Sequence, residues 1–329
     1  MAAASPARAP ARAPEPLCSS SVSVVICAYT ERRWDALAEA VTSVAAQTPA
    51  PLQTIVVIDH NPALLARACA CLARIERVTV IANTGVRGLS GARNSGVACA
   101  HGEIVAFLDD DARAEPGWLA SLVAPFSNAN VIGAGGVARP EWEAAAPQWI
   151  PEEFLWVVGC SYRGLPAMFA PIRNPIGANM AFRRDVLERT GGFADGIGRI
   201  GRTPLGCEET ELSIRARELT GGTIVHVPHC TVRHRVSAER TSWSYYRRRC
   251  WSEGLSKALV RARVGAGAAL ASEREYVFRT LPSAFFNELR ASLGGNFLGA
   301  VRACAIVVGV AITAAGYLSG CMRMRWRKR

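Results

Sequence analysis

Three consecutive carboxylates stand at the end of an apolar run. Residues 104–108 (IVAFL) carry no polar side chain, and Asp109, Asp110 and Asp111 follow directly. Adjacent carboxylates repel one another unless a cation or hydrogen bonds compensate their charges. Mg²⁺ and Mn²⁺ take one or two carboxylates and fill their other positions with water and phosphate oxygens. The pattern therefore indicates a metal and phosphate site, with a solvated acidic turn as the alternative.

The spacing within this cluster favours two of the three aspartates as ligands. Alternate side chains of an extended chain point to the same side, so we expect Asp109 and Asp111 to point together and Asp110 to point away. Such an Asp-x-Asp pair can hold a metal together with the ligand that the metal bridges.

A second pair of carboxylates, Glu208 and Glu209, begins a predicted helix over 208–222. Acidic residues at a helix N-terminus stabilise the helix dipole, which is one interpretation of this pair. A carboxylate can also act as a general base that removes the proton of a reacting hydroxyl. The residues by themselves leave both interpretations open.

The elements that must position these side chains alternate between strand and helix. Apolar, β-branched runs predict strands over 22–29, 54–59, 78–83 and 103–109, and helical spacing predicts helices over 31–47, 62–74 and 89–100. This alternation indicates an α/β fold with a mostly parallel central sheet. Ligands of such sheets lie beyond the carboxyl ends of the strands. Tyr29, Asp59, Asn83 and the three aspartates all stand at such ends.

Composition limits the function classes. The chain has 329 residues, half of them hydrophobic, and a net charge of +11, which favours anionic partners such as phosphorylated ligands, a membrane surface or nucleic acid. Its 11 cysteines include no Cys-x-x-Cys pair, so neither a zinc site nor a disulfide framework is indicated. We expect a reducing compartment.

The two ends of the chain differ in kind from its centre. Residues 1–20 are rich in Ala, Pro and Arg without an apolar centre, so we expect a disordered tail rather than a secretory signal. A basic helical region is expected over 241–296, a hydrophobic membrane-associated or transmembrane segment over 297–322, and a basic tail over 323–329. Residues 303–322 carry no charge and are long enough to span a bilayer. One span would place the basic tail outside, against the positive-inside tendency, whereas a segment lying on the surface avoids this. A buried core helix is the remaining alternative.

Several motifs occur in a characteristic order: VSVVICAYTER, VVID, GLSGARNSG, FLDDDARAEPGWL, GANMAFRRDVLERTGGF and EETELSIRA. Together, over residues 21–236, they resemble the family 2 glycosyltransferases, which have the nucleotide-sugar-binding GT-A fold. The resemblance extends to prokaryotic enzymes that build lipid-linked glycans and exopolysaccharides. It implies a GT-A glycosyltransferase domain over 21–240.

The resemblance also implies roles for individual residues. It places the donor nucleotide against Ala28, Tyr29, Thr30, Glu31, Asp59, Arg93, Asn94, Asp109 and Asp110. It places Mg²⁺ or Mn²⁺ against Asp111, Asp109 and His234. It makes Glu209 the catalytic base with Glu208 as its helper, and it presents Gly177, Ala178 and Asn179 to the donor sugar or the acceptor.

The resulting expectation is a metal-dependent, inverting glycosyltransferase at the cytoplasmic face of the cell membrane. It would move a sugar from an NDP-sugar, with a UDP-sugar preferred, to a lipid-linked or polysaccharide acceptor, and it would contact membrane lipid through its C-terminal segment. We expect no nucleic acid. The alternatives are a sugar-phosphate nucleotidyltransferase, a catalytically inactive glycosyltransferase-like protein and a basic nucleic-acid-binding protein.

Overall fold

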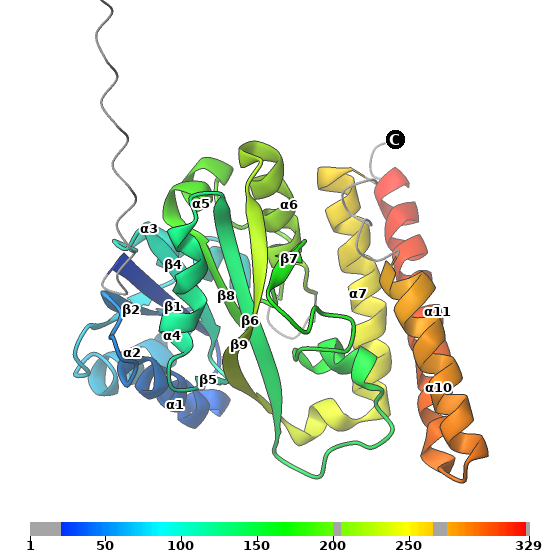
Figure 1. The fold of residues 1–329 in the computed structure, drawn as a ribbon. Helices are drawn as coiled ribbons and strands as arrows, with labels where there is room; N and C mark the ends of the chain where they lie inside the picture. Colours follow the sequence, from blue (N-terminus) through cyan, green and yellow to red (C-terminus); the bar gives the residue numbers. More distant parts are fainter. Residues whose placement is uncertain (1–20, 200–204, 266–274, 327–329) are drawn as a thin grey trace, which may run out of the picture.

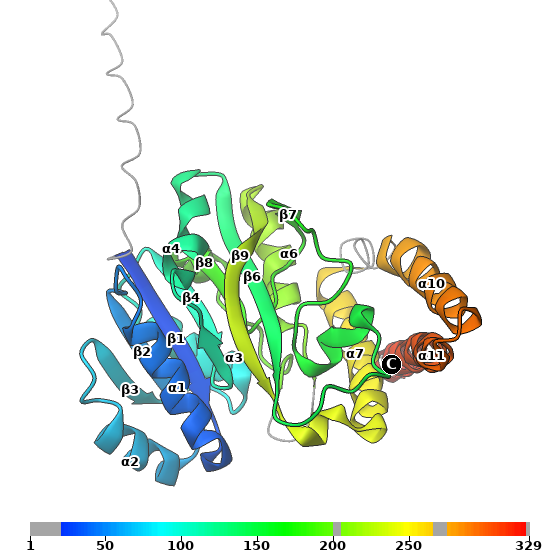
Figure 2. The ribbon, with the colours of Figure 1, turned by 60° about the horizontal axis from the view of Figure 1, so that its bottom comes forward.

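A central sheet with helices on both faces forms the larger part of the molecule (Figures 1 and 2). The computed structural model describes residues 21–199, 205–265 and 275–326. The tail predicted over 1–20 and residues 327–329 of the predicted basic tail lie outside these ranges. Within them, the sheet has the strand order β3-β2-β1-β4-β8-β6-β9-β5, and β7 pairs with β9.

The N-terminal half of the sheet is parallel. Its strands are β1 (Val22–Ala28), β2 (Gln53–Ile58), β3 (Val78–Ala82) and β4 (Ile104–Asp109). The strands β1, β2 and β4 are almost completely buried, which explains why they lack the alternation of polar and apolar residues. Their carboxyl ends therefore lie at one edge of the sheet.

The second half of the sheet is mixed. Its strands are β5 (Ala112–Ala114), β6 (Val131–Trp142), β7 (Ala170–Ile172), β8 (Asn179–Arg183) and β9 (Thr223–Val236). β6 and β9 run parallel to each other, and β8 runs antiparallel to both β4 and β6. Six of the nine described strands therefore point the same way, with β5, β7 and β8 reversed. The predicted α/β class with a mostly parallel sheet is confirmed.

Helices cover both faces of the sheet. The helices α1 (Trp34–Ala45), α2 (Pro62–Cys71) and α4 (Trp118–Val123) pack on one face. The helices α3 (Leu89–Ala98), α5 (Arg184–Thr190) and α6 (Glu208–Thr220) pack on the other. Short 3₁₀ turns are η2 (Glu31–Arg33), η3 (Ala124–Ser127), η4 (Glu152–Val158) and η5 (Ala238–Thr241). The long segment between β6 and β7 contains η4.

The C-terminal helices form a separate layer beside the sheet (Figure 2). This layer contains α7 (Trp243–Val264), the π-helical turn η6 (Tyr276–Thr280), α10 (Leu281–Leu293) and α11 (Phe297–Trp326). α7 and α11 lie side by side along their lengths (Figure 1). They approach so closely that a Cβ at Gly254 would lie 2.1 Å from the carbonyl oxygen of Thr313, and one at Gly316 would lie 2.4 Å from that of Trp251.

Candidate active site

The carboxyl edge of the parallel strands opens into a cavity of about 1070 Å³. The cavity extends from this edge to the C-terminal helices. Many of the predicted site residues line it, namely Ala28, Tyr29, Asp59, Arg93, Asp109, Asp110, Asp111, Gly177, Glu208, Glu209 and His234. The topology of the sheet brings these residues together from seven separate parts of the chain.

Arg93 joins the two acidic groups of the cavity. Its guanidinium donates to Glu208 Oε1 at 2.8 Å, to the carbonyl of Gly177 at 3.0 Å and to Asp109 Oδ1 at 3.3 Å. Only 2% of its side chain is exposed, and a buried cation requires such partners. Arg93 therefore holds the end of β4 and the start of α6 in a fixed relation.

The residues after β4 form a turn rather than an extended chain. Asp110 and Asp111 lie in this turn, between β4 and β5, and both contact Arg33. The Arg33 guanidinium lies 2.8 Å from Asp110 Oδ1 and 3.1 Å from Asp111 Oδ2. The prediction that Asp110 points away from its neighbour is wrong, because strand alternation stops where the turn begins.

Asp110 combines burial with an incomplete set of partners. Burial raises the pKa of its carboxyl to about 6, against the opposing effect of Arg33. Its Oδ2 atom is buried and has no hydrogen-bond partner within the described residues. An orphaned oxygen of this kind in a cavity wall is suited to a ligand that donates a hydrogen bond.

Asp111 is surrounded by cations. His234 Nε2 lies 3.2 Å from its Oδ1, and Arg240 Nη2 lies 3.0 Å from its Oδ2. Burial alone would raise the pKa of Asp111, but His234, Arg33 and Arg240 hold it well below its ordinary value. Asp111 in turn raises the pKa of the His234 imidazole to about 10 against the effect of burial. β5 and β9 produce this arrangement because they pair Ala112 with His234.

These residues fit a divalent metal ion. Asp109, Asp111 and His234 each offer one ligand atom, and these atoms all lie within 4.8 Å of one another. Two carboxylate oxygens and one imidazole nitrogen suit Mn²⁺, and Mg²⁺ tolerates the oxygens. The cluster is therefore compatible with metal binding.

Glu208 and Glu209, at the start of α6, differ in their burial and in their hydrogen-bond partners. Glu208 is buried and paired with Arg93. Glu209 is half-buried and accepts a hydrogen bond from Thr210 Oγ1 at 3.1 Å. Burial, and next the charge of Glu208, raise the pKa of Glu209 to about 8. A carboxyl with this pKa can accept a proton near neutral pH.

Asp59 follows the end of β2, two strands away from the end of β4 where the aspartate cluster lies. Its Oδ1 accepts from Asn83 Nδ2 at 2.6 Å, and its Oδ2 accepts from the backbone amide of Gly88 at 3.0 Å. These bonds fix the carboxylate between β2 and the loop before α3. Together with Ala28 and Tyr29 it forms the wall predicted for the nucleotide.

Five predicted residues are not among those that line the cavity, and their ligand contacts stay predictions. The side chain of Thr30 caps η2 by accepting a hydrogen bond from the backbone amide of Arg32. Glu31 is exposed. Asn94 exchanges two hydrogen bonds of 2.8 Å with the backbone of Phe193. Ala178 is buried in the core.

Asn179 is the fifth of these residues. It begins β8 inside the sheet and is fully buried. Its side chain bonds to the Trp118 indole and to the carbonyls of Val137 and Cys230. These bonds join Asn179 to β6, β9 and α4, and its contact with the donor sugar or the acceptor stays a prediction.

Several residues that line the cavity were not predicted from the sequence, among them Arg33, Arg240 and Arg249. A signal for such residues exists, because adjacent carboxylates at the end of a buried strand require cations nearby. This signal does not identify which of the chain's many arginines neutralise the carboxylates.

A partly parallel sheet with an Asp-x-Asp pair at the end of β4 and a carboxylate pair at the start of α6 defines a glycosyltransferase of the GT-A class. Residues 23–191 match the family described as glycosyl transferase family 2. The chain belongs to this family.

Two relatives of the chain are also named as glycosyltransferases. Glucosyl-dolichyl phosphate glucuronosyltransferase of Haloferax volcanii is 35% identical over 240 residues, which are 73% of this chain and 77% of that protein. Polypeptide N-acetylgalactosaminyltransferase 15 of Mus musculus is 26% identical over 80% of this chain, but the chain spans only 42% of that protein.

The folds of two glycosyltransferases of known structure are similar. The mannosyltransferase PcManGT from Pyrobaculum calidifontis, solved with GDP-Man and Mn²⁺, has a TM-score of 0.60 at 19% identity, covering 93% of this chain and 89% of that one. GalNAc-T7, solved with UDP, GalNAc and Mn²⁺, has a TM-score of 0.52 at 21% identity, covering 77% and 53%. At these identities the likeness concerns the fold.

Proposed function

We propose that this enzyme is an inverting glycosyltransferase that moves a sugar from a UDP-sugar to a lipid-linked saccharide at the cytoplasmic face of a membrane. The observation that carries the proposal is the position of Glu209 in the same cavity as the cluster of Asp109, Asp111 and His234. One group suits a metal and diphosphate, and the other suits proton removal from an acceptor.

The donor would occupy the edge formed by β1, β2 and β4. Ala28, Tyr29 and Asp59 would hold the nucleoside. Asp109, Asp111 and His234 would hold Mn²⁺ or Mg²⁺, and the bound ion supplies charge neutralisation for the departing nucleoside diphosphate. Arg33 lines the same cavity and adds a positive charge beside this position.

Glu209 would act on the acceptor. Its carboxylate takes the proton of the acceptor hydroxyl while the hydroxyl oxygen bonds to the anomeric carbon and the bond from that carbon to the diphosphate breaks. Such a single displacement inverts the configuration at the anomeric carbon. Glu208, held by Arg93, keeps the start of α6 in place and raises the pKa of its neighbour.

Two observations support a lipid-linked acceptor. The Haloferax volcanii relative is named for a dolichyl phosphate acceptor. Residues 297–324, within α11, form a helix that is long and apolar enough to cross a membrane by length and composition, and its most apolar 18-residue window has a mean hydropathy of 2.1. Only 28% of its most apolar window is buried, which disfavours the alternative of a buried core helix.

Calorimetric titration tests the donor half of the proposal. Purified protein is titrated with UDP, GDP and dTDP, each with Mn²⁺ and each with EDTA. We expect UDP to bind most tightly and its affinity to fall by at least about tenfold without the metal, because the diphosphate then faces the carboxylates directly. Tighter binding of GDP would replace the UDP assignment, and no binding of any nucleotide would contradict the enzyme assignment.

A further inference from the structure

The cavity continues beyond Glu209 along one face of α7. Arg249, Glu253 and Lys257 are spaced by four residues and line the cavity together. Glu253 accepts from Arg249 at 3.0 Å and lies 3.3 Å from the ammonium of Lys257. The three side chains are 13%, 12% and 21% exposed. Two cations and one carboxylate leave a net charge of +1 in a largely desolvated wall.

This charged face lies directly against the start of α6. The thiol of Cys207, the residue before Glu208, donates to Glu253 Oε1 at 3.3 Å. Although burial raises the pKa of Glu253, Lys257 and Arg249 lower it to about 2, so this carboxylate stays ionised and orients both cations. The guanidinium of Arg249 also lies 5.8 Å from the Trp156 ring centre. The cations are therefore held in place beside the start of α6.

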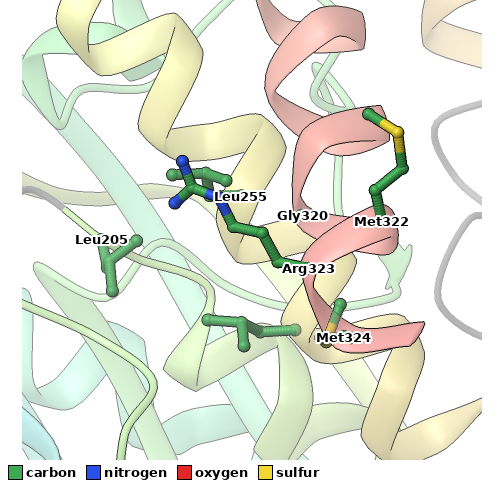
Figure 3. A pocket seen from close by; sticks show the side chains of 7 residues that line it. Leu205, Leu255, Gly320, Met322, Arg323 and Met324 are labelled. Atoms are coloured by element: carbon green, nitrogen blue, oxygen red, sulfur yellow. The ribbon is translucent and has the colours of Figure 1, made fainter. Parts of the chain in front are cut away.

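An apolar hollow adjoins this part of the cavity. It has a volume of about 600 Å³ and lies between α7 and the end of α11. Its walls are mainly leucine and methionine side chains, with Arg323 reaching across it from α11 (Figure 3). Leu205 lines both the hollow and the large cavity, so the two spaces adjoin at this residue.

We propose that Arg249 and Lys257 bind the phosphate of a polyprenyl-phosphate-linked acceptor, and that the hollow between α7 and α11 receives the first isoprene units of its lipid. The inference rests on the proposed function and adds to it the site of the acceptor. A phosphodiester carries one negative charge, which matches the net charge of the Arg249–Glu253–Lys257 group. The order of carboxylate base, cations and apolar hollow matches the order of sugar, phosphate and lipid in such an acceptor.

The alternative ligand for these cations is the diphosphate of the donor. Geometry disfavours it, because the donor diphosphate is assigned to the Asp109, Asp111 and His234 cluster, whereas Arg249 contacts Glu253 and Trp156 on the α7 side. The experiment below separates the two sources of phosphate.

The test uses the full-length protein and two probes, citronellyl phosphate and inorganic phosphate, titrated by calorimetry in the presence of saturating UDP and Mn²⁺. We expect citronellyl phosphate to bind at least about tenfold more tightly than inorganic phosphate, because its ten carbons enter the hollow. Arg249→Met should weaken both probes by about tenfold or more, the usual effect of losing a charge-assisted hydrogen bond. Leu255→Gln, in the wall of the hollow, should weaken citronellyl phosphate alone.

The controls keep the result interpretable. Arg247→Met removes an exposed arginine of the same helix and should leave both probes unchanged. The affinity of Arg249→Met for UDP, measured separately, should stay within about twofold of the parent protein. Weaker UDP binding with unchanged citronellyl phosphate binding would assign Arg249 to the donor and overturn the inference. Equal affinity of the parent for the two probes would overturn the lipid part. Failure of the parent to bind UDP would instead refute the proposed function.

Discussion

Two carboxylate groups face the same cavity, and they differ in what surrounds them. Asp111, at the end of the parallel strands, is held by three cationic side chains, which keep its pKa well below the ordinary value. Glu209 lies at the start of α6, where burial, and next the charge of Glu208, raise its pKa to about 8. The carboxylate surrounded by cations is suited to a permanent charge, whereas the carboxylate beside another acid is suited to exchange a proton.

The difference originates in how Arg93 and the other arginines are distributed. Arg33 and Arg240 both contact Asp111. The guanidinium of Arg93 instead donates hydrogen bonds to Glu208, Asp109 and the carbonyl of Gly177. Glu209 is thus the member of its pair that keeps no direct guanidinium contact within the described residues. Pairs of titratable groups with opposed environments commonly divide the tasks of a mechanism in this way.

Removing the charge of Asp111 should have the largest effect. Asp111→Asn should abolish metal-dependent UDP binding and reduce turnover by about 10³-fold or more, because the proposed metal site loses a ligand. It should also lower the free energy of unfolding by about 3–5 kcal/mol, since Arg240 and His234 remain buried without their partner. Calorimetry measures the UDP binding, a transfer assay measures the turnover, and urea unfolding measures the free energy of unfolding.

A companion variant separates the ligand role from the loss of stability. The side chain of Asp109 is 30% exposed, so Asp109→Asn should lose metal-dependent binding at a smaller cost in stability. Asp35→Asn, an exposed aspartate on α1, serves as the matched control. Metal-dependent UDP binding retained in both Asp109→Asn and Asp111→Asn would refute the metal assignment.

Neutralising Glu209 should give a smaller effect of a different kind. Glu209→Gln should reduce kcat by about 10²- to 10⁴-fold, the usual contribution of a general base, while the affinity for UDP and Mn²⁺ stays unchanged. Glu218→Gln, exposed on the same helix, should match the parent enzyme. Near-normal turnover of Glu209→Gln would show that another group removes the proton.

The smallest effect concerns pH, and it has opposite signs for activity and stability. Because the pKa of Glu209 is about 8, turnover should rise with pH until about 8 and then level off. Between about pH 5 and 8 the folded state keeps a proton that the unfolded chain has released, so the free energy of unfolding should fall as pH rises. Urea unfolding at several pH values should show a shallower fall for Glu209→Gln. An unchanged slope in this variant would contradict the raised pKa.

Much of the fold could be predicted because the strong local signals agree with one another. The apolar runs within 22–29 and 104–108 are typical of buried strands, and polar residues at their ends indicate the binding edge. The position of His234 beside Asp111 depends on the pairing of β5 with β9. Residue spacing alone does not predict that His234 lies near Asp111, and His234 was named only because of the resemblance to a family.

The rest depends on contacts between distant parts of the chain. Arg33 and Asp110 are 77 residues apart, and Arg240 and Asp111 are 129 residues apart. Nothing local distinguishes these arginines from the exposed ones. In the same way, the polar residues Asn94 and Asn179 stand in motifs that suggest ligand contact, yet backbone groups brought near by folding use their hydrogen-bonding capacity.

The close approach of α7 and α11 has a consequence for the surroundings in which this enzyme can work. At Gly254 and Gly316 the two helices meet through their backbones, with no space for a side chain. Attraction at such a contact comes from dispersion forces, which do not require water to be expelled. The helix pair should therefore keep its geometry in detergent, in hydrocarbon and in water alike, whereas a contact between large apolar side chains would loosen in lipid.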